Sequence, residues 1–493
     1  MFRTVTFLCF FLLSLAFGPR RDGFAAEVPR NLVWIIADDM SLDTGAYGVK
    51  GIQTPHLDRL AAEGRRYDRA YSSAPVCSSS RSAFILGTYQ TTTGLHPHDA
   101  ENPQPLADPY VPLPTLLQKA GWFVTNAAAP IVEGSSKSTK GKTHYNFSHE
   151  AKTLFDGDDW RQRKEGQPFF AQFQIKEPHR PFSIPESFDE KSLEAILIPA
   201  NYPDHPLVRR DWYAYQRSVE IVDRRVGAIL DQLEEEGVLD STLVIFFGDH
   251  GRAMPWGKQW LNVEGLGVPL LMRGPGIEKG SVEKRLVSLI DLAPSALEIA
   301  GLPIPDWMEG RSILGPEFPE RDVIFAARDR CGDAMDRIRA VISEDHLLVR
   351  NYFPELSHLN WSGYKEASYP GMALLRVMNA EHRLDPLQAS WLAPNRPEIE
   401  LYDLRKDPDG IHNVADDPTN RETVAMLTRR LNAQFQPSTD KGATGDPDSE
   451  PPLAEIQASK RKDYNRTWEK RLKTAEPTDA ERLRWWLDQY RVK

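Results

Sequence analysis

The residue types most able to do chemistry stand close together in the segment Cys-Ser-Ser-Ser-Arg, which begins at Cys77 and enters an expected helix. The chain has three cysteines, and Cys9 falls in an apolar leader that we expect to be removed. Cys77 and Cys331 then remain, so a disulfide between them is one interpretation. We favour a chemical role for Cys77, because it heads a more specific pattern that ends at Arg81.

Two pairs of adjacent polar residues follow apolar runs and could hold a metal ion. Asp38 and Asp39 form the first pair, and Asp249 and His250 form the second. Ligand sites collect at the carboxyl ends of strands in open α/β sheets. Oxygen-rich ligation favours Ca²⁺, with Mg²⁺ as the second choice. A polar turn or a helix cap is the alternative for either pair.

The pattern of elements predicts an α/β fold with a large, mostly parallel central sheet flanked by helices, and a smaller C-terminal antiparallel subdomain. The expected strands of the first unit are 31–37, 122–125, 169–175 and 242–247. Its expected helices include 209–236 and 286–300. Short strands follow at 339–342, 346–351 and 400–404. We therefore expect a catalytic domain over 27–322, the subdomain over 323–435, and a linker and helical tail over 436–493.

Composition and the N-terminus limit the possible roles. The chain has 493 residues and a formal net charge of −10, so no global basic field favours nucleic acid. Arg3 and the apolar run 5–17 predict a signal peptide over residues 1–26, and no later stretch is apolar enough to span a membrane. We expect an exported protein, periplasmic or secreted. The tail carries Trp485 and Trp486, and we expect it to dock on the body through them rather than serve as a binding arm.

In order along the chain, these motifs resemble those of the sulfatase family within the alkaline phosphatase superfamily. Cys77 to Arg81 is similar to the family motif C-x-[PA]-x-R, with Ser79 in place of the usual Pro or Ala. The resemblance implies that a formylglycine-generating maturation enzyme oxidises Cys77 to formylglycine. The spacing looks most like bacterial relatives of heparan N-sulfatase. Asp38, Asp39, Asp249 and His250 match the family's metal ligands, together with the modified residue 77.

The resemblance also implies a set of residues that act on sulfate. Lys142 and His144 match G-K-x-H, although an insertion over 126–140 leaves Ala129 as an alternative at the lysine position. His179 resembles the histidine of H-x-P-F, and Lys258 resembles the second sulfate-binding lysine.

The implied mechanism begins when the hydrate of formylglycine 77 attacks sulfur with help from Asp249. The metal, Arg81, Lys142 and Lys258 then stabilise the sulfuryl oxygens. His179 assists the leaving group, and His144 removes the proton whose loss releases sulfate.

Specificity and two rival functions stay open at this stage. Arg328 and Arg330 near the domain junction suit recognition of an anionic sugar, or form an interdomain ion-pair cluster. Trp256, Trp260 and Trp361 could stack on sugar rings or belong to the core. We expect a sulfatase acting on O- or N-sulfate of a sulfated carbohydrate. The rivals are a phosphodiester or phosphonate monoester hydrolase, and a non-catalytic glycan-binding protein if Cys77 is not matured.

Overall fold

The computed structural model describes residues 29–137, 140–315, 318, 320–443, 453–474 and 476–492. The expected signal peptide, 1–26, lies outside the described residues. The central sheet has seven strands in the order β4-β5-β1-β6-β7-β2-β8. These strands are β1 (Asn31–Ala37), β2 (Arg65–Tyr67), β4 (Phe123–Ala128), β5 (Phe169–Ile175), β6 (Thr242–Gly248), β7 (Leu270–Arg273) and β8 (Ser281–Glu283). β4, β5, β1 and β6 are parallel, and β7 runs against β6 and β2, which confirms the predicted mostly parallel sheet.

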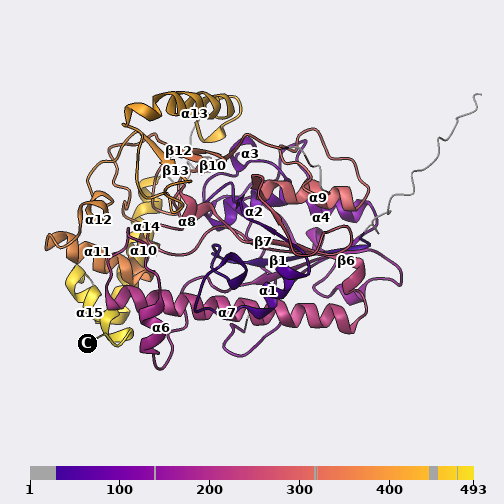
Figure 1. The fold of residues 1–493 in the computed structure, drawn as a ribbon, viewed down its shortest axis with the longest axis horizontal. Helices are drawn as coiled ribbons and strands as arrows, with labels where there is room; N and C mark the ends of the chain where they lie inside the picture. Colours follow the sequence, from indigo (N-terminus) through magenta and orange to yellow (C-terminus); the bar gives the residue numbers. More distant parts are fainter. Residues whose placement is uncertain are drawn as a thin grey trace, which may run out of the picture.

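Both faces of the sheet are buried, which explains why the central strands read as continuous apolar runs. In β1, Val33 and Ile35 face the core beside α1 and α7, whereas Leu32 and Trp34 face the core beside α2, α4 and α9. The two sets of helices lie on opposite sides of the sheet (Figure 1). The bounds are α1 Pro55–Ala62, α2 Cys77–Leu86, α4 Leu113–Lys119, α7 Pro206–Glu235 and α9 Leu292–Ile299.

The N-terminal ends of two helices are satisfied partly by local residues and partly by tertiary contacts. Thr54 is the N-cap of α1, as its position before Pro55 predicts, but its side chain makes no capping hydrogen bond. Instead, Asp223 of α7 accepts a hydrogen bond from the backbone N–H of Leu57 at 2.8 Å. The expected helix 286–300 is shorter than predicted: residues 287–288 form β9, which pairs with β3 (Ala70–Tyr71). Ser288 then starts a capping box with Asp291, ahead of α9.

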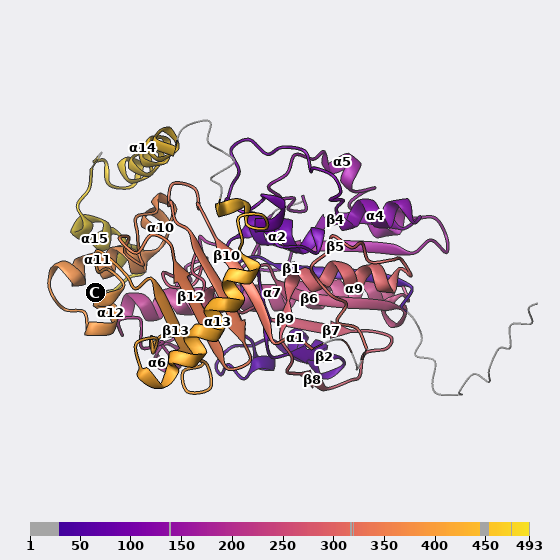
Figure 2. The ribbon, with the colours of Figure 1, turned by 90° about the horizontal axis from the view of Figure 1, so that it is seen from above.

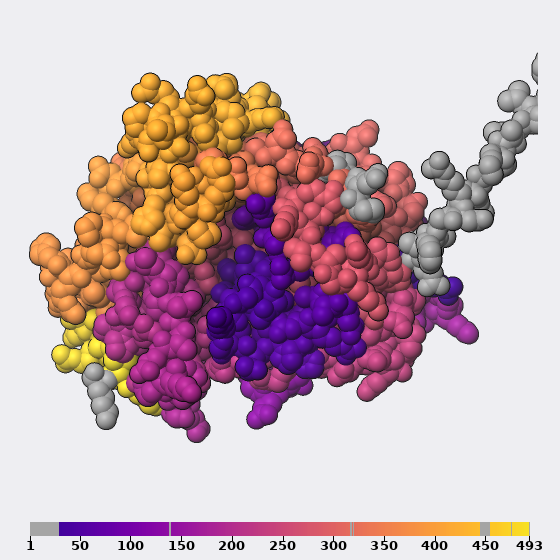
Figure 3. Space-filling view, in the orientation of Figure 1, coloured from indigo at the N-terminus to yellow at the C-terminus, as the bar shows by residue number. Residues whose placement is uncertain are grey.

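The smaller sheet is antiparallel throughout, in the order β10-β11-β12-β13, as predicted. Its strands are β10 (Val323–Arg328), β11 (Ile338–Ser343), β12 (His346–Asn351) and β13 (Ile399–Asp403). Helix α13 (Arg421–Gln434) covers one face through Leu427 and Leu431, and Figure 2 shows it lying across these strands. Figure 3 shows one face of the molecule, on which the gold surface of α13 lies above the indigo surface of the early part of the chain.

The tail docks on the body, and three of its tryptophans pack against one another. It folds as α14 (Leu453–Leu472) and α15 (Asp479–Gln489). Trp468 is fully buried and makes edge contacts with Trp485 and Trp486. Tyr490 donates a hydrogen bond at 2.7 Å to Asp211 of α7, which ties the chain's last helix to the longest one. α15 also packs beside α11 (Pro370–Ala380).

Candidate active site

The motifs singled out in the sequence meet at the carboxyl ends of β1, β5 and β6. Because these strands are parallel neighbours, residues that follow each of them share one edge of the sheet. The first residue of α2 faces the same point. The side chains brought together are Asp38, Asp39, Cys77, Arg81, Lys142, His144, His179, Asp249, His250 and Lys258.

Two lysines from distant loops each pair with one carboxylate of the first acidic pair. Lys142 Nζ lies 2.7 Å and 2.8 Å from the carboxylate oxygens of Asp38. Lys258 Nζ lies 2.9 Å from both oxygens of Asp39 and 3.4 Å from Cys77 Sγ. Asp39 and Lys258 are buried, so these ion pairs are strong and poorly screened. The chain that follows the insertion at 126–140 therefore brings Lys142 into the site.

Arg81 joins the two acidic pairs from inside the core. Its Nε donates to Asp249 Oδ2 at 2.8 Å, and its Nη2 donates to Asp38 Oδ1 at 3.1 Å. Nη1 donates to Gln174 of β5 at 2.8 Å, a contact that nothing in the sequence pattern indicated. The guanidinium is 2% exposed, so its charge is balanced entirely by these neighbours. Burial opposes the charged form, but Asp249 and Asp38 outweigh that effect and raise the pKa of Arg81.

Five residues form a donor set that fits a hard divalent cation: Asp38, Asp39, Cys77, Asp249 and His250. Ligand atoms of Asp39, Cys77 and His250 lie within 4.8 Å of one another, as do those of Asp38, Cys77 and Asp249. All of these residues are buried. His250 Nδ1 donates to the carbonyl of Gly251 at 2.8 Å, which orients Nε2 toward Asp39 and Cys77.

The backbone at Asp39 is itself unusual. Asp39 has a φ of 63°, in the left-handed region that non-glycine residues seldom adopt. Its N–H donates to Asp249 Oδ1 at 2.9 Å, which links the ends of β1 and β6. Residues held in this conformation cluster at functional sites. The turn aims the carboxylate of Asp39 at Cys77, 3.6 Å away.

The thiol of Cys77 lies in a strongly cationic setting at the N-terminus of α2. Burial would raise the pKa of this thiol, but Lys142, Lys258 and His250 outweigh burial and hold it well below its ordinary value. The positive end of the helix dipole acts in the same direction. An anion formed at this position is therefore stabilised from several sides.

His144 is paired with an acid that the sequence analysis did not identify. Its Nε2 lies 2.5 Å from Asp99 Oδ1. Burial would lower the pKa of His144, but the hydrogen bond with Asp99 and the interactions with Cys77 together outweigh it, and the pKa rises to about 9. His98 lies beside this pair, and burial lowers its pKa to about 4. Asp99 stands 45 residues before its partner in an irregular loop, so no local pattern marked it.

His179 sits at the edge of the site, just beyond β5. Its Nε2 is 3.7 Å from Asp39 Oδ2, and its Nδ1 is 2.6 Å from the carbonyl of Arg180. Burial would lower the pKa of His179, but Asp39, Cys77 and Asp38 together outweigh it, and the pKa is raised overall. The side chain is 24% exposed, so it can reach a ligand that enters from solvent.

Ser79, which departs from the family motif, is accommodated in the folded chain. It is fully buried in α2 and donates a hydrogen bond to the carbonyl of His96 at 3.0 Å. Asn146 donates to the Ser79 hydroxyl at 3.4 Å. The hydroxyl thus has partners, and the helix is not distorted at Cys77.

A cavity of about 450 Å³ leads from solvent down to Cys77. Lys142, His144, His179 and Lys258 line its inner end. Its outer walls come from the loop at 98–99, from 331–333, from α10 (Gly363–Ser368) and from α14. A second cavity of about 420 Å³ lies on the other side of Lys142 and includes Arg225 in its lining.

Arg328 and Arg330, expected as sugar-binding residues, do not line the cavity. Both are buried, at 1% exposure each. Arg328 Nη1 donates to Asp336 at 2.7 Å, and Arg330 Nη1 donates to the carbonyl of Gly332 at 3.2 Å. Arg396 also pairs with Asp336, which matches the alternative of an ion-pair cluster. The sequence indicated that these arginines lie near the junction. It could not show that Arg328 pairs with Asp336, eight residues later.

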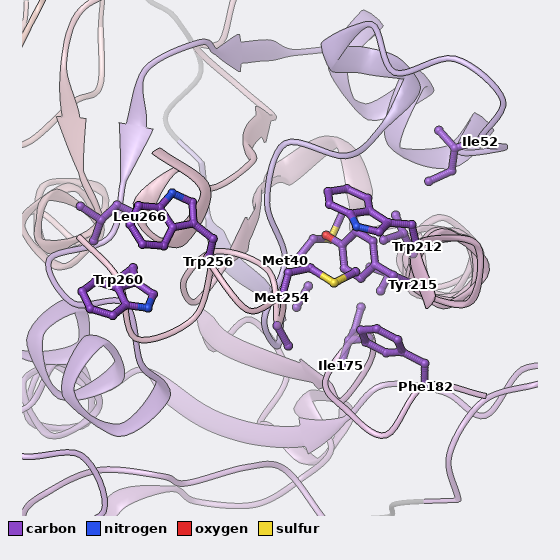
Figure 4. Close-up of a cluster of buried hydrophobic side chains, with 14 of the residues drawn as sticks. Met40, Ile52, Ile175, Phe182, Trp212, Tyr215, Met254, Trp256, Trp260 and Leu266 are labelled. Atoms are coloured by element: carbon purple, nitrogen blue, oxygen red, sulfur yellow. The ribbon is translucent and has the colours of Figure 1, made fainter. Parts of the chain in front are cut away.

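Of the tryptophans considered for sugar stacking, Trp256 and Trp260 belong to the interior and Trp361 is partly buried. Trp256 and Trp260 are 4% and 5% exposed, and Trp256 stacks on Trp391 at 4.0 Å between ring centroids. Figure 4 shows both rings in a buried cluster with Met254 and Leu266. Trp361 makes an edge contact with Tyr464 of α14 at 5.4 Å. The two cysteines of the described chain, Cys77 and Cys331, are free and buried, so no disulfide joins them.

Buried carboxylates and paired cations around a single nucleophile at strand ends define a site for hydrolysis of an anionic ester. A family model described as Sulfatase matches residues 30–302, which is more than half of the chain. The chain belongs to the sulfatase family and is a sulfuric ester hydrolase.

Curated relatives agree with this assignment, and solved structures share the fold. An ulvan-active sulfatase of Formosa agariphila is 30% identical over 454 residues, covering 81% of this chain and 74% of the relative. Human N-sulphoglucosamine sulphohydrolase is 27% identical over 474 residues, covering 83% and 90%. A structure in complex with its substrate D-glucosamine-2-N,6-O-disulfate has a TM-score of 0.59 at 18% identity, covering 85% and 100%. The phosphonate monoester hydrolase of Silicibacter pomeroyi also has a TM-score of 0.59 at 18% identity, covering 83% and 96%.

Proposed function

We propose that this protein is a formylglycine-dependent, metal-dependent sulfatase that removes sulfate from a sulfated carbohydrate. The observation that carries the proposal is the position of Cys77: it heads α2, lies 3.4 Å from Lys258 and 3.3 Å from His250, and closes the inner end of the cavity. A buried thiol with this many cationic neighbours has no structural purpose, because apolar packing would need none of them.

The donor set supports a metal cofactor, Ca²⁺ by preference and Mg²⁺ as the second choice. Asp38, Asp39, Asp249 and His250 would hold it together with residue 77. When bound, a divalent cation supplies positive charge for the sulfuryl oxygens and lowers the pKa of a bound hydroxyl. Three of these ligands are carboxylates, which favours a hard cation over a soft one.

Formylglycine at position 77 would supply a hydrated aldehyde as the nucleophile, made from Cys77 by a formylglycine-generating maturation enzyme. We assign Asp249 as the group that takes a proton from the hydrate, a role supported by burial, which raises its pKa to about 6 against the opposing effect of Arg81. Lys142 and Lys258 would bind the sulfate oxygens. A carboxylate whose pKa lies near the working pH suits a general base.

We assign the two histidines to proton transfer at opposite stages. His179, at the partly exposed edge of the cavity, would protonate or hydrogen-bond the leaving atom of the substrate. His144, held by Asp99, would accept the proton whose removal expels sulfate. Each lies on the lining of the same cavity, so both reach the group bound at residue 77.

Relatives support a carbohydrate substrate. One of them is named for activity on ulvan and another for N-sulphoglucosamine, and a protein of the same fold was solved with a sulfated glucosamine. We propose a sulfated sugar, cut at oxygen or at nitrogen. We also propose export to a periplasm or to the medium, since the N-terminal sequence resembles a signal peptide. The structure has, over its described residues, no helix both long and apolar enough to cross a bilayer.

The decisive experiment is a mass spectrum of the peptide that contains Cys77, from protein co-expressed with a formylglycine-generating enzyme. We expect the mass of the aldehyde or its hydrate, and release of sulfate from sulfated sugars that Cys77→Ala abolishes. Preference for phosphonate monoesters or phosphodiesters over sulfates in an activity panel would favour the rival hydrolase, whose fold is shared. An unmodified thiol with retained binding of sulfated sugar would favour the binding protein.

A further inference from the structure

Helix α14 forms one wall of the cavity above Cys77, although it belongs to a tail beyond both sheets. One face of this helix lines the cavity, opposite the loop at 98–99. The residues on that face are Lys460, Asp463, Tyr464 and Thr467. A ligand whose sulfate reaches Cys77 must therefore place the rest of its structure against α14.

The wall is held firmly enough to recognise a ligand. Trp468 is fully buried, and its neighbour in the helix, Arg471, donates to the carbonyl of Ala367 at 2.6 Å. Tyr464 packs edge-on against Trp361 and is 5% exposed. Groups mounted on a rigid element bind with less loss of conformational entropy than groups on a mobile one.

The charge of the outer cavity differs from that of its inner end. The inner end carries Lys142 and Lys258. The outer part is lined by the carboxylates of Asp333 and Asp463 and by one lysine, whereas Asp99 is already paired with His144. A second anion on the substrate would therefore meet carboxylates once its sulfate is seated.

The single outer lysine does not cancel this field. Lys460 Nζ lies 3.7 Å from Glu101 Oε1, so it already faces an acid. Asp463 lies 3.3 Å from Arg466, but both side chains are more than half exposed, and such pairs are weak and easily exchanged. Asp463 thus remains available to a ligand in the cavity.

Tyr364 supplies an independent sign that a polar ligand belongs here. It lines the same cavity, and its hydroxyl is buried with no hydrogen-bond partner among the described residues. Buried hydroxyls are normally paired, and a hydroxyl or amine of a ligand would complete this one. Lys258 lies 5.3 Å from the centre of the same ring, so Tyr364 stands where the inner cationic part meets the outer acidic part.

Building on the proposed sulfatase function, we infer that the α14 wall selects a sugar that is uncharged or carries an amine beyond its reacting sulfate, and that it rejects one bearing a second anion. The carboxylates of Asp333 and Asp463 accept hydrogen bonds from hydroxyl and ammonium groups, and they repel a uronate or a second sulfate at the same place. Recognition of the leaving sugar thus depends on Asp463 of the C-terminal tail, together with Asp333, and not on buried arginines.

The test compares two substrates that carry the same sulfate: a monosulfated hexosamine, and the same hexosamine linked to a uronate. We expect matured enzyme to prefer the first by about tenfold or more in kcat/KM. Asp463→Lys should narrow that ratio several-fold. The matched control is Glu469→Lys, a change of equal charge at an exposed residue of α14 outside the cavity lining, and it should leave the ratio unchanged.

Other outcomes overturn the inference. Equal rates on the two substrates, a preference for the uronate, or equal effects of the two lysine variants would do so. A small aryl sulfate, assayed in parallel, separates this from failure of the proposed function: no sulfate release from any of the three substrates would reject the sulfatase proposal itself. Both variants change exposed side chains, and an unchanged melting temperature would show that each is folded.

Discussion

The carboxylate of Asp99 lies 2.5 Å from Nε2 of His144 and, together with Cys77, raises the pKa of that histidine to about 9 against the opposing effect of burial. We predict that Asp99→Asn lowers the pKa of His144, because the amide cannot stabilise the imidazolium as a carboxylate does. Because His144 acts after the leaving group has departed, the acidic limb of the kcat profile, which His144 controls, should move to lower pH by about one unit. The measurement is a pH–rate profile of matured enzyme on a small aryl sulfate.

A merely structural role for Asp99 would lower the rate equally at every pH. An unchanged profile shape with a uniformly lower rate would therefore contradict the prediction. Asp99→Glu serves as the conservative variant, since it restores a carboxylate near His144, and should return the limb toward that of the natural chain. Asp158→Asn is a suitable control, because this acid lies outside the cavity lining. This variant should leave the pH–rate profile unshifted.

Much of the scaffold was predictable from local sequence, and for a clear reason. Strands buried on both faces are continuous apolar runs, so β1 and β5 were bounded to the residue by the polar residues that end them. Metal-type donors directly after such runs were predicted to meet, and they do. Contacts made across loops had no such signal. Asp99 pairs with His144 in another loop. Arg328 pairs with Asp336 and does not face a ligand.

The tail shows the same division between what is local and what is tertiary. Trp485 and Trp486 indicated docking on the body; Trp486 is buried and Trp485 is partly buried. Amphipathic spacing shows which side of a helix is covered, but it does not reveal which part of the molecule lies beneath. The placement of Tyr464 on the active-site cavity depends on packing against α10, which only the folded chain displays.

Calcium should stabilise the folded protein. Asp38, Asp39 and Asp249 bring three carboxylates into a buried site, so a bound dication relieves their mutual repulsion and is held only by the folded state. We expect a chelator to lower the melting temperature and abolish activity, and added Ca²⁺ to restore both. A ligand at a hundred times its Kd contributes about 2.7 kcal/mol, which differential scanning calorimetry resolves.

Asp39→Asn provides the matched variant for the calcium experiment. Asparagine tolerates the left-handed backbone that Asp39 adopts, so the turn is kept while one charged ligand is lost. The calcium-dependent rise in melting temperature should shrink or vanish in this variant. A full rise in the variant would show that calcium binds elsewhere on the chain, and no rise in the natural chain would argue against calcium as the cofactor.

The buried ion pair between Arg180 and Asp211 should matter to stability more than any surface pair. Both side chains are at most 5% exposed, and Asp211 also accepts the hydrogen bond from Tyr490. Asp211→Ala leaves the guanidinium buried without its partner, so we expect a loss of about 3–5 kcal/mol in the free energy of unfolding. Asp204→Ala removes the exposed partner of Arg209 and should cost at most about 1 kcal/mol. Equal urea midpoints for the two variants would refute this ranking.

The sequence leaves two candidates for the family's lysine position, Lys142 and Ala129. A substitution at Lys142 distinguishes between them. If the family's lysine position were Ala129, Lys142 would be one of several lysines in a solvated loop, and its loss would cost little. The structure places its Nζ 2.7 Å from Asp38, on the lining of the cavity that ends at Cys77. Lys142→Met keeps the length of the side chain and removes the charge. We therefore expect kcat/KM for an aryl sulfate to fall about 10²–10³-fold, the range found when one stabilising donor is removed from an oxyanion site.

The same assay on Lys152→Met supplies the control, because Lys152 is an exposed lysine of the neighbouring short helix α5 (Ala151–Leu154) and lies outside the cavity lining. A loss of less than about threefold in Lys142→Met, or an equal loss in both variants, would return the site to the alternative without this lysine. The fall should appear mainly in kcat, since charge develops on the sulfuryl oxygens in the transition state and a lysine aimed there binds that state more strongly than the ground state.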